Sequence, residues 1–172
     1  MPLRLWRPDD AAALHAALRD EFDRLSPWIP AAVADPATPS DVRARLEGYA
    51  RDAAAERAWR YGIWSDDGAE LWGELSLFPR DASRRVARRD ADRLEIGYWL
   101  RAAVTGRGIA TDAARTAIAM ARAWRGYRAV EIRCDARNAA SAGVPARLGF
   151  TCVDEGTTPG ALQVWSLSIG DG

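Results

Sequence analysis

The chain has 172 residues, of which 48% are apolar and 28% charged, which is typical of one soluble globular domain with a full core. Its 24 basic residues are all arginine and balance 24 acids, so a strongly basic nucleic-acid-binding protein is excluded. The charge is uneven, because residues 1–75 carry a net charge of −5 and residues 76–172 one of +5. This asymmetry indicates either partners of opposite charge for the two halves or solvated helix faces.

Several protein classes are excluded by what the chain lacks. Two cysteines, Cys134 and Cys152, are too few for a disulfide framework, and no Cys/His cluster has the spacing of a zinc site. Residues 1–8 lack the apolar run of a signal peptide, and no stretch is long enough to cross a membrane. We therefore expect a cytoplasmic protein. The one histidine, His15, lies in a helical Ala/Leu pattern, where a structural role is expected rather than a hydrolytic one.

The first half of the chain predicts a strand, two helices and a hairpin. The predicted elements are a strand over residues 3–6, a helix over 8–22, a helix from 39 to about 57, and strands over 59–65 and 71–78. Thr38-Pro39-Ser40-Asp41 supplies an N-cap, a proline at the first helical position and an acid at the third. Four prolines between residues 26 and 39 predict a long irregular connection. Asp66-Asp67-Gly68 predicts the hairpin turn.

The second half predicts strands that alternate with helices. The Arg-rich segment 79–92 has no period and is expected to form a loop. The predicted elements after it are a strand over 93–100, a helix over 108–123, a strand over 129–134, a helix over 139–148 and strands over 151–154 and 162–168. The order β-α-α-β-β-β-α-β-α-β-β predicts a mixed α/β fold in a single domain over residues 1–172.

The strongest candidate for a binding site is the turn between the strand that ends at Leu100 and the next helix. Thr105-Gly106-Arg107-Gly108 lets the backbone turn tightly and approach a ligand, and the N–H groups of a helix start point at one place. Such a turn suits a phosphate or pyrophosphate, with Arg107 adding a positive charge. A Walker loop is excluded because the chain has no lysine, and a helix start without a ligand is the alternative.

Four motifs then follow one another along the chain. They are Glu95-Ile96-Gly97-Tyr98-Trp99-Leu100, Gly106-Arg107-Gly108-Ile109-Ala110-Thr111, Asn138-Ala139-Ala140-Ser141 and Leu148-Gly149-Phe150. With the element order, they resemble the GNAT superfamily of acyl-CoA-dependent N-acetyltransferases, above all its Rim-type branch, named for ribosomal-protein N-terminal acetyltransferases. The resemblance covers nearly the whole chain. It implies one GNAT-like domain with a central mixed, mostly antiparallel sheet of about seven strands and about four flanking helices.

The resemblance implies acetyl-CoA as co-substrate and no metal. Backbone amides would surround its pyrophosphate from Gly106, Arg107, Gly108, Ile109, Ala110 and Thr111. The main chain of Trp99, Leu100 and Arg101 would bond the pantetheine arm. Asn138 would contact the cofactor from the next strand–helix turn, and Arg147 would approach the nucleotide or lie on a solvated helix face. Thr105 departs from the family, which usually has Gln, Arg or an aromatic residue there.

Acetyl transfer to an amine needs a neutral nucleophile, a polarised carbonyl and a proton for the leaving thiolate. The resemblance implies Glu95 as general base, with Glu74 on the neighbouring strand as the reserve candidate. An ion pair across the sheet is the alternative for Glu95. Ser141 would be the general acid, although Pro145 predicts a kink in its helix. An acetyl-cysteine intermediate is disfavoured because no histidine is placed to activate a thiol.

The acceptor is expected against the first two helices, their Pro-rich connection and the Arg-rich loop, with Trp28, Trp72 and Phe78 as walls. The leading prediction is an enzyme that acetylates a protein or peptide N-terminus by direct attack in a ternary complex. A small amine (an aminoglycoside, polyamine or amino-acid derivative) is the second acceptor class. An acyl-CoA-binding regulatory module without turnover is the third hypothesis. A homodimer is common in the branch, and the oligomeric state stays open.

Overall fold

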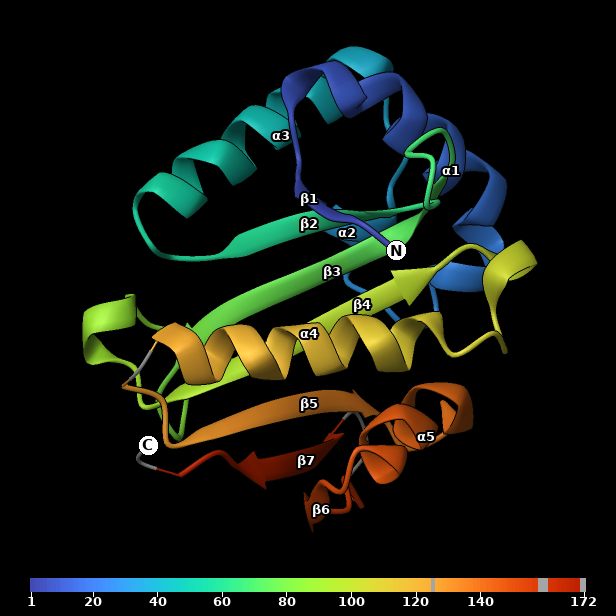
Figure 1. Ribbon diagram of the computed structural model, residues 1–172. Coiled ribbons are helices and arrows are strands. Elements are labelled where there is room, and N and C mark those ends of the chain that lie inside the picture. The colour runs from blue at the N-terminus through green and yellow to red at the C-terminus, as the bar shows by residue number, and fades with distance from the viewer. Residues whose placement is uncertain (125, 158–160, 171–172) are drawn as a thin grey trace. The chain divides into compact units, whose positions relative to one another are not determined.

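The computed structural model describes residues 1–124, 126–157 and 161–170, which contain seven strands and five α-helices (Figure 1). The strands are β1 (Leu3–Leu5), β2 (Trp59–Trp64), β3 (Leu71–Arg80), β4 (Arg93–Leu100), β5 (Ala129–Asp135), β6 (Thr151–Asp154) and β7 (Leu162–Ser168). The α-helices are α1 (Ala11–Leu25), α2 (Ala31–Ala34), α3 (Pro39–Ala54), α4 (Ile109–Trp124) and α5 (Ala139–Arg147). Short 3-10 helices are η1 (Pro8–Asp10), η2 (Arg88–Asp90) and η3 (Ala102–Val104).

The seven strands follow the order β1-β2-β3-β4-β5-β7-β6. β1 pairs antiparallel with β2, and β7 pairs antiparallel with both β5 and β6. β4 and β5 run parallel, and their pairing covers Arg93–Ile96 and Ala129–Ile132, so it ends before either strand does. The predicted mixed α/β fold with a mostly antiparallel sheet is confirmed.

The structure corrects four details of the predicted elements. The Pro-rich connection contains α2, one turn of helix between Pro30 and Asp35, so there are five helices rather than about four. α1 continues to Leu25, whose buried side chain extends the apolar face. α3 ends at Ala54, before Glu56 takes a positive φ of 51°. β3 continues through Pro79 to Arg80, into the segment that was expected to be a loop.

The predicted start of α3 is confirmed in detail. The Thr38 hydroxyl accepts from the Asp41 backbone N–H at 3.2 Å, and the Asp41 carboxylate accepts from the Thr38 N–H at 3.2 Å. Two of the backbone donors at the helix start are therefore satisfied reciprocally. Pro39 occupies the first turn, where its missing N–H is not needed.

The described chain forms two compact units. The first consists of Met1–Leu75 and Tyr98–Ile109, and the second of Ser76–Gly97 and Ala110–Gly172. β3, β4 and α4 each contribute residues to both.

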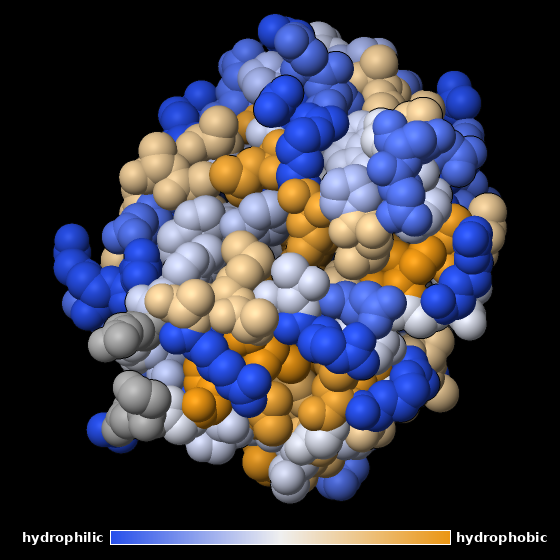
Figure 2. Space-filling view, in the orientation of Figure 1, coloured by the Kyte–Doolittle hydropathy of each residue, from blue (hydrophilic) through white to orange (hydrophobic). Residues whose placement is uncertain are grey.

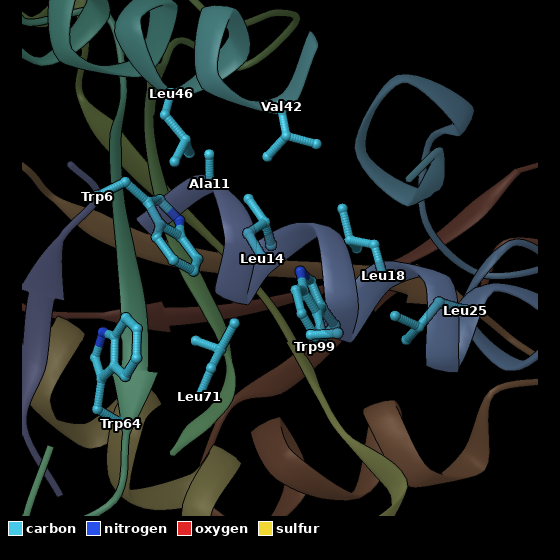
Figure 3. Close-up of a cluster of buried hydrophobic side chains, with 11 residues drawn as sticks. Trp6, Ala11, Leu14, Leu18, Leu25, Val42, Leu46, Trp64, Leu71 and Trp99 are labelled. Carbon is cyan, nitrogen blue, oxygen red and sulfur yellow. The ribbon is translucent and has the colours of Figure 1, made fainter. Parts of the chain in front are cut away.

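The core of the first unit is built from α1, α3 and three tryptophans, which are Trp64 of β2, Trp99 of β4 and Trp6 just after β1 (Figure 3). Side chains four residues apart lie on one helix face, so Leu14 and Leu18 of α1 share a core with Leu46 of α3. Trp6 and Trp64 meet edge to face, with ring centroids 6.1 Å apart. The cluster consists of Trp6, Ala11, Leu14, Ala17, Leu18, Leu25, Val42, Leu46, Trp64, Leu71 and Trp99. The Trp99 side chain is therefore a core residue, which anchors the end of β4.

The second unit buries the apolar residues of β4 and β5 and the small residues of α4. The fully buried side chains are Leu94, Ile96, Val130, Ile132, Ala113, Ala114, Ala117 and Ala121. α5 contacts β5, the strand that carries Cys134. No helix in the described part of the chain is both long and apolar enough to span a membrane. Hydrophilic and hydrophobic residues are interspersed on the face in Figure 2.

A hollow of about 380 Å³ in the first unit lies against α3, β1 and β2. Its walls include Trp6, Trp59 and alanines of α3, with Tyr49 and Arg60 as the polar groups. The Arg60 guanidinium lies 4.5 Å from the centre of the Tyr49 ring. Burial, and then the Glu74 charge, raise the pKa of Tyr49 to about 12.

We expect the free energy of unfolding to fall as the pH rises from about 10 to about 12, because the pKa of Tyr49 is raised in the folded protein. The unfolded phenol ionises in this range while the folded phenol stays neutral, so the unfolded state is favoured by about 2–3 kcal/mol. Tyr49→Phe should remove this part of the alkaline loss. Urea unfolding of both proteins at about pH 9 and about pH 11.5 measures it. Parallel losses in the two proteins would contradict the prediction.

Candidate active site

The glycine turn before α4 has the geometry of an anion site. Gly106 and Gly108 adopt φ values of 73° and 82°, a region that residues with side chains rarely enter. A Cβ at either position would meet no described atom within 4 Å, so the backbone conformation, rather than space, requires glycine. The turn leads directly into α4, whose first N–H groups favour negative charge. This geometry suits an anion, and the assignment of the turn to the pyrophosphate of CoA stays a prediction.

Thr105 has a local role that explains its presence in place of a larger residue. Its hydroxyl donates to the Ala102 carbonyl at 2.9 Å, and its backbone N–H donates to the same oxygen at 3.1 Å. These two bonds close η3 immediately before Gly106. Val104, which is buried, anchors the same turn. The glycine turn therefore starts from a hydrogen-bonded 3-10 turn.

The main chain that was predicted to bond pantetheine already has partners inside the first unit. The Arg101 N–H donates to the Trp72 carbonyl at 2.7 Å. The Leu100 carbonyl accepts from Arg24 of α1. Sequence reasoning missed Arg24, because its partner lies 76 residues further along the chain.

Arg107, which was predicted to bind the cofactor, lies close to Trp72, which was predicted to line the acceptor site. The Arg107 guanidinium lies 5.6 Å from the centre of the Trp72 ring, and the Trp72 indole donates to Glu70 at 3.3 Å. Trp28, another predicted acceptor wall, lies in the turn after α1 and is 41% exposed. Its role as a wall of the acceptor site stays a prediction.

Glu95, the candidate base, forms an ion pair, which was the alternative role predicted for this residue. Its carboxylate is buried, and its two oxygens accept from Arg80 and Arg85. The Arg85 guanidinium also lies 3.5 Å from the centre of the Phe78 ring and covers this predicted acceptor wall. Base catalysis by Glu95 stays a prediction, and a proton acceptor there would have to compete with two guanidinium groups.

Glu131 extends the same charge network on β5. It is 1% exposed and accepts from Arg93 at 2.8 Å and from Arg133 at 2.9 Å, with Arg80 at 3.5 Å. Burial raises the pKa of Glu131, but the hydrogen bonds from Arg93 and Arg133 outweigh it and hold the pKa below its usual value. Sequence periodicity does not reveal this network, because its charges occupy positions that usually hold apolar residues.

Glu74, the reserve candidate, is also engaged on both oxygens. The Trp6 indole donates to one oxygen at 2.9 Å, and Arg60 donates to the other at 2.8 Å. The residue is 2% exposed. Both candidate bases therefore have structural partners.

The candidate acid Ser141 lies in the first turn of α5. Its N–H donates to the Asn138 side-chain oxygen at 3.1 Å, so Asn138 caps the helix. Pro145 lies within α5, which continues to Arg147, so the proline does not end the helix. Burial raises the pKa of the Cys134 thiol, although a side-chain hydrogen bond with Ser141 opposes this rise. Cys134 is therefore a protonated thiol near neutral pH and a poor nucleophile.

Arg147 lies beside the predicted pyrophosphate segment. Its Nε donates to the Thr111 hydroxyl at 3.4 Å, which joins the end of α5 to the start of α4. In the described residues, no group of three or more His, Cys, Asp or Glu side chains is placed to hold a metal ion.

A mostly antiparallel seven-stranded sheet, with a glycine turn that opens the helix after β4, defines the class of GNAT acyltransferases. The model of the acetyltransferase (GNAT) domain matches residues 1–151, and the chain belongs to this family. As a member of it, the protein is an enzyme that transfers an acetyl group from acetyl-CoA, its co-substrate.

Relatives and solved structures agree with this assignment. The chain is 32% identical to the Bacillus subtilis (strain 168) protein named "Putative ribosomal N-acetyltransferase YdaF" over 165 residues, which are 94% of this chain and 82% of that protein. RimL, a ribosomal L7/L12 alpha-N-protein acetyltransferase in complex with coenzyme A, has a TM-score of 0.80 at 21% identity, covering 97% and 93% of the two chains. MccE, a microcin C7 self-immunity acetyltransferase in complex with acetyl-CoA and AMP, has a TM-score of 0.81 at 21% identity, covering 97% and 91%.

Glu95→Gln should lower the free energy of unfolding by about 3 kcal/mol, because it removes one of the two anionic partners of the buried Arg80 guanidinium and leaves only Glu131 at 3.5 Å. Urea denaturation measures the change. Asp112→Asn is the matched control, since it removes an ion pair with Arg115 that is exposed on both sides and contributes at most about 1 kcal/mol. A stable Glu95→Gln protein whose rate loses its pH dependence would instead support base catalysis.

Proposed function

We propose that the protein acetylates the N-terminal α-amine of a protein or peptide by direct attack on acetyl-CoA in a ternary complex. The observation that carries the proposal is the engagement of Glu95 and Glu74, which each bind donors on both carboxylate oxygens. The one histidine, His15, has its Nδ1 atom 3.0 Å from the Pro36 carbonyl. The two carboxylates that were predicted as bases are therefore both engaged in structural bonds.

The ionisation of the acceptor then decides which amine can react. An α-amine with a pKa of about 8 is partly neutral at about pH 7.5 and needs little help from a base. A lysine-like amine with a pKa of about 10.4 must give up its proton at a cost of about 4 kcal/mol at this pH. A site whose carboxylates are tied to arginines suits the α-amine.

In the proposed reaction, the amine nitrogen forms a bond to the acetyl carbon and the bond between this carbon and the CoA sulfur breaks. The amine proton passes to water. The Ser141 hydroxyl turns from Cys134 to the sulfur of the leaving thiolate and donates its proton there. The proton that water took from the amine then restores the Ser141 hydroxyl, so the products are the amide and the CoA thiol. Because the pKa of Cys134 is raised, no acetyl-cysteine is part of this route.

The comparisons support the acceptor class. The Bacillus subtilis relative is named for ribosomal N-acetylation, and RimL for the α-amine of ribosomal L7/L12. We carry this class to the present chain as a protein N-terminus, acted on in the cytoplasm by a single domain over residues 1–172. The small amine stays the second candidate and the binding module the third.

A peptide with a free Ser or Ala N-terminus should release CoA thiol at about pH 7.5, whereas the same peptide with a blocked N-terminus and an internal lysine should not. A thermal shift with acetyl-CoA in the same plate shows that the co-substrate binds. Thiol release with spermidine or an aminoglycoside alone would transfer the proposal to a small amine. A thermal shift without release from any acceptor would favour the binding module.

Ser141→Ala should lower kcat about tenfold and leave both KM values nearly unchanged, because a proton donor assists a thiolate leaving group whose pKa is about 8.5 without being indispensable. Steady-state kinetics with the reactive peptide measures the effect. Cys134→Ala is the matched control, since it removes the present partner of Ser141 and should keep turnover. Unchanged turnover in Ser141→Ala would remove Ser141 from the mechanism.

A further inference from the structure

Two charged residues of α1 bind the chain where it leaves β4. Glu21 and Arg24, one helical turn apart, form an ion pair in which Arg24 Nε donates to Glu21 Oε2 at 2.6 Å. The other oxygen of Glu21 accepts from the Ala102 backbone N–H at 3.0 Å. A second nitrogen of Arg24 donates to the Leu100 carbonyl. One ion pair therefore holds the backbone on both sides of Arg101.

The position of Glu21 is unusual for a carboxylate that serves packing alone. It is 9% exposed and lies on the face of α1 that carries the core residues Leu14, Leu18 and Leu25. Burying a carboxylate costs free energy unless it is paired and hydrogen-bonded, so an apolar residue would fill the same space more favourably. What the carboxylate adds is a directed acceptor for one backbone amide.

That amide is the first one of η3. From Ala102 the chain makes a single 3-10 turn, which Thr105 closes with two bonds to the Ala102 carbonyl, and Gly106 follows at once. The strand before it has its own attachment through the Arg101 N–H to Trp72. Glu21 therefore controls the part of the segment after Arg101, which carries the glycine turn.

We propose that Glu21 and Arg24 are positioning residues that fix η3, and through it the turn at Gly106–Gly108, for the pyrophosphate of CoA. The proposal rests on the assignment of this turn to the cofactor and is independent of the acceptor. The pair affects the binding of CoA rather than the acetyl-transfer step, because it positions donors that bind CoA equally in the ground state and the transition state. Its loss should therefore change affinity for CoA and not turnover.

Glu21→Gln keeps an oxygen for the Ala102 N–H but loses the charge that holds Arg24, and Arg24→Gln loses the bond to Leu100. Calorimetry should show that each variant binds CoA about tenfold more weakly than the wild type, the size of one charge-assisted hydrogen bond. The KM for acetyl-CoA should rise equally, and kcat should stay within about twofold. For Glu21→Gln, which acts after Arg101, the affinity for pantetheine, which lacks the pyrophosphate, should fall by at most about threefold.

Arg19→Gln is the matched control, because Arg19 lies on the same helix and pairs with Asp20 at an exposed position. It should bind CoA as the wild type does. Arg24 is 40% exposed, so Arg24→Gln provides the test if Glu21→Gln does not fold. Unfolding by urea and far-ultraviolet circular dichroism show that each variant is folded.

The proposal is overturned if folded variants bind CoA normally, if CoA and pantetheine lose affinity equally in Glu21→Gln, or if kcat falls while the KM is constant. Failure of the wild-type chain to bind CoA would overturn the cofactor site and the positioning role together. Wild-type CoA binding without turnover of any amine, with weakened binding in the variants, would support the positioning role and contradict only the proposed acceptor.

Discussion

A buried carboxylate needs a partner for its negative charge, and in this protein each of four buried glutamates pairs with arginine. They are Glu21, Glu74, Glu95 and Glu131. Arginine carries five N–H donors in a fixed fork, so one side chain can bind a carboxylate and still reach a second acceptor. Arg24 does this with Glu21 and the Leu100 carbonyl, and Arg80 with Glu95 and Glu131. Because a buried ion that loses its partner is strongly destabilising, these pairs restrict how each unit can pack.

The same constraint shapes the chemistry that we propose. Both carboxylate oxygens of Glu95 and of Glu74 already bind donors, so either residue would have to give up a structural hydrogen bond to act on the amine. The Cys134 thiol is equally unsuited to attack, because burial raises its pKa. An acceptor that supplies its own neutral amine, such as a peptide α-amine, is compatible with this arrangement. The enzyme then contributes binding, orientation and a proton for the leaving sulfur.

The segment that we propose binds the cofactor is held in place by interactions with both neighbouring and distant residues. Gly106 and Gly108 take backbone angles that glycine alone adopts readily, and Thr105 closes the preceding turn. These are local features, and one part of the chain supplies them all. The anchor of this turn is distant, since Glu21 lies 81 residues before Ala102. A helix of the first half of the chain thereby takes part in holding the segment that we propose binds CoA.

Local patterns in the sequence determined most of the helices and strands and the glycine turn before α4. Thr38 and Asp41 form the predicted capping box, β4 covers the predicted residues, and the glycines precede α4 as expected, because caps, strands and turns depend on neighbouring residues. Tertiary structure alone decided the partners of the charged residues. Nothing in the spacing of Glu95 or Glu21 indicates Arg80 or Ala102, because such pairs form only when packing brings distant segments together and burial makes each charge require a partner.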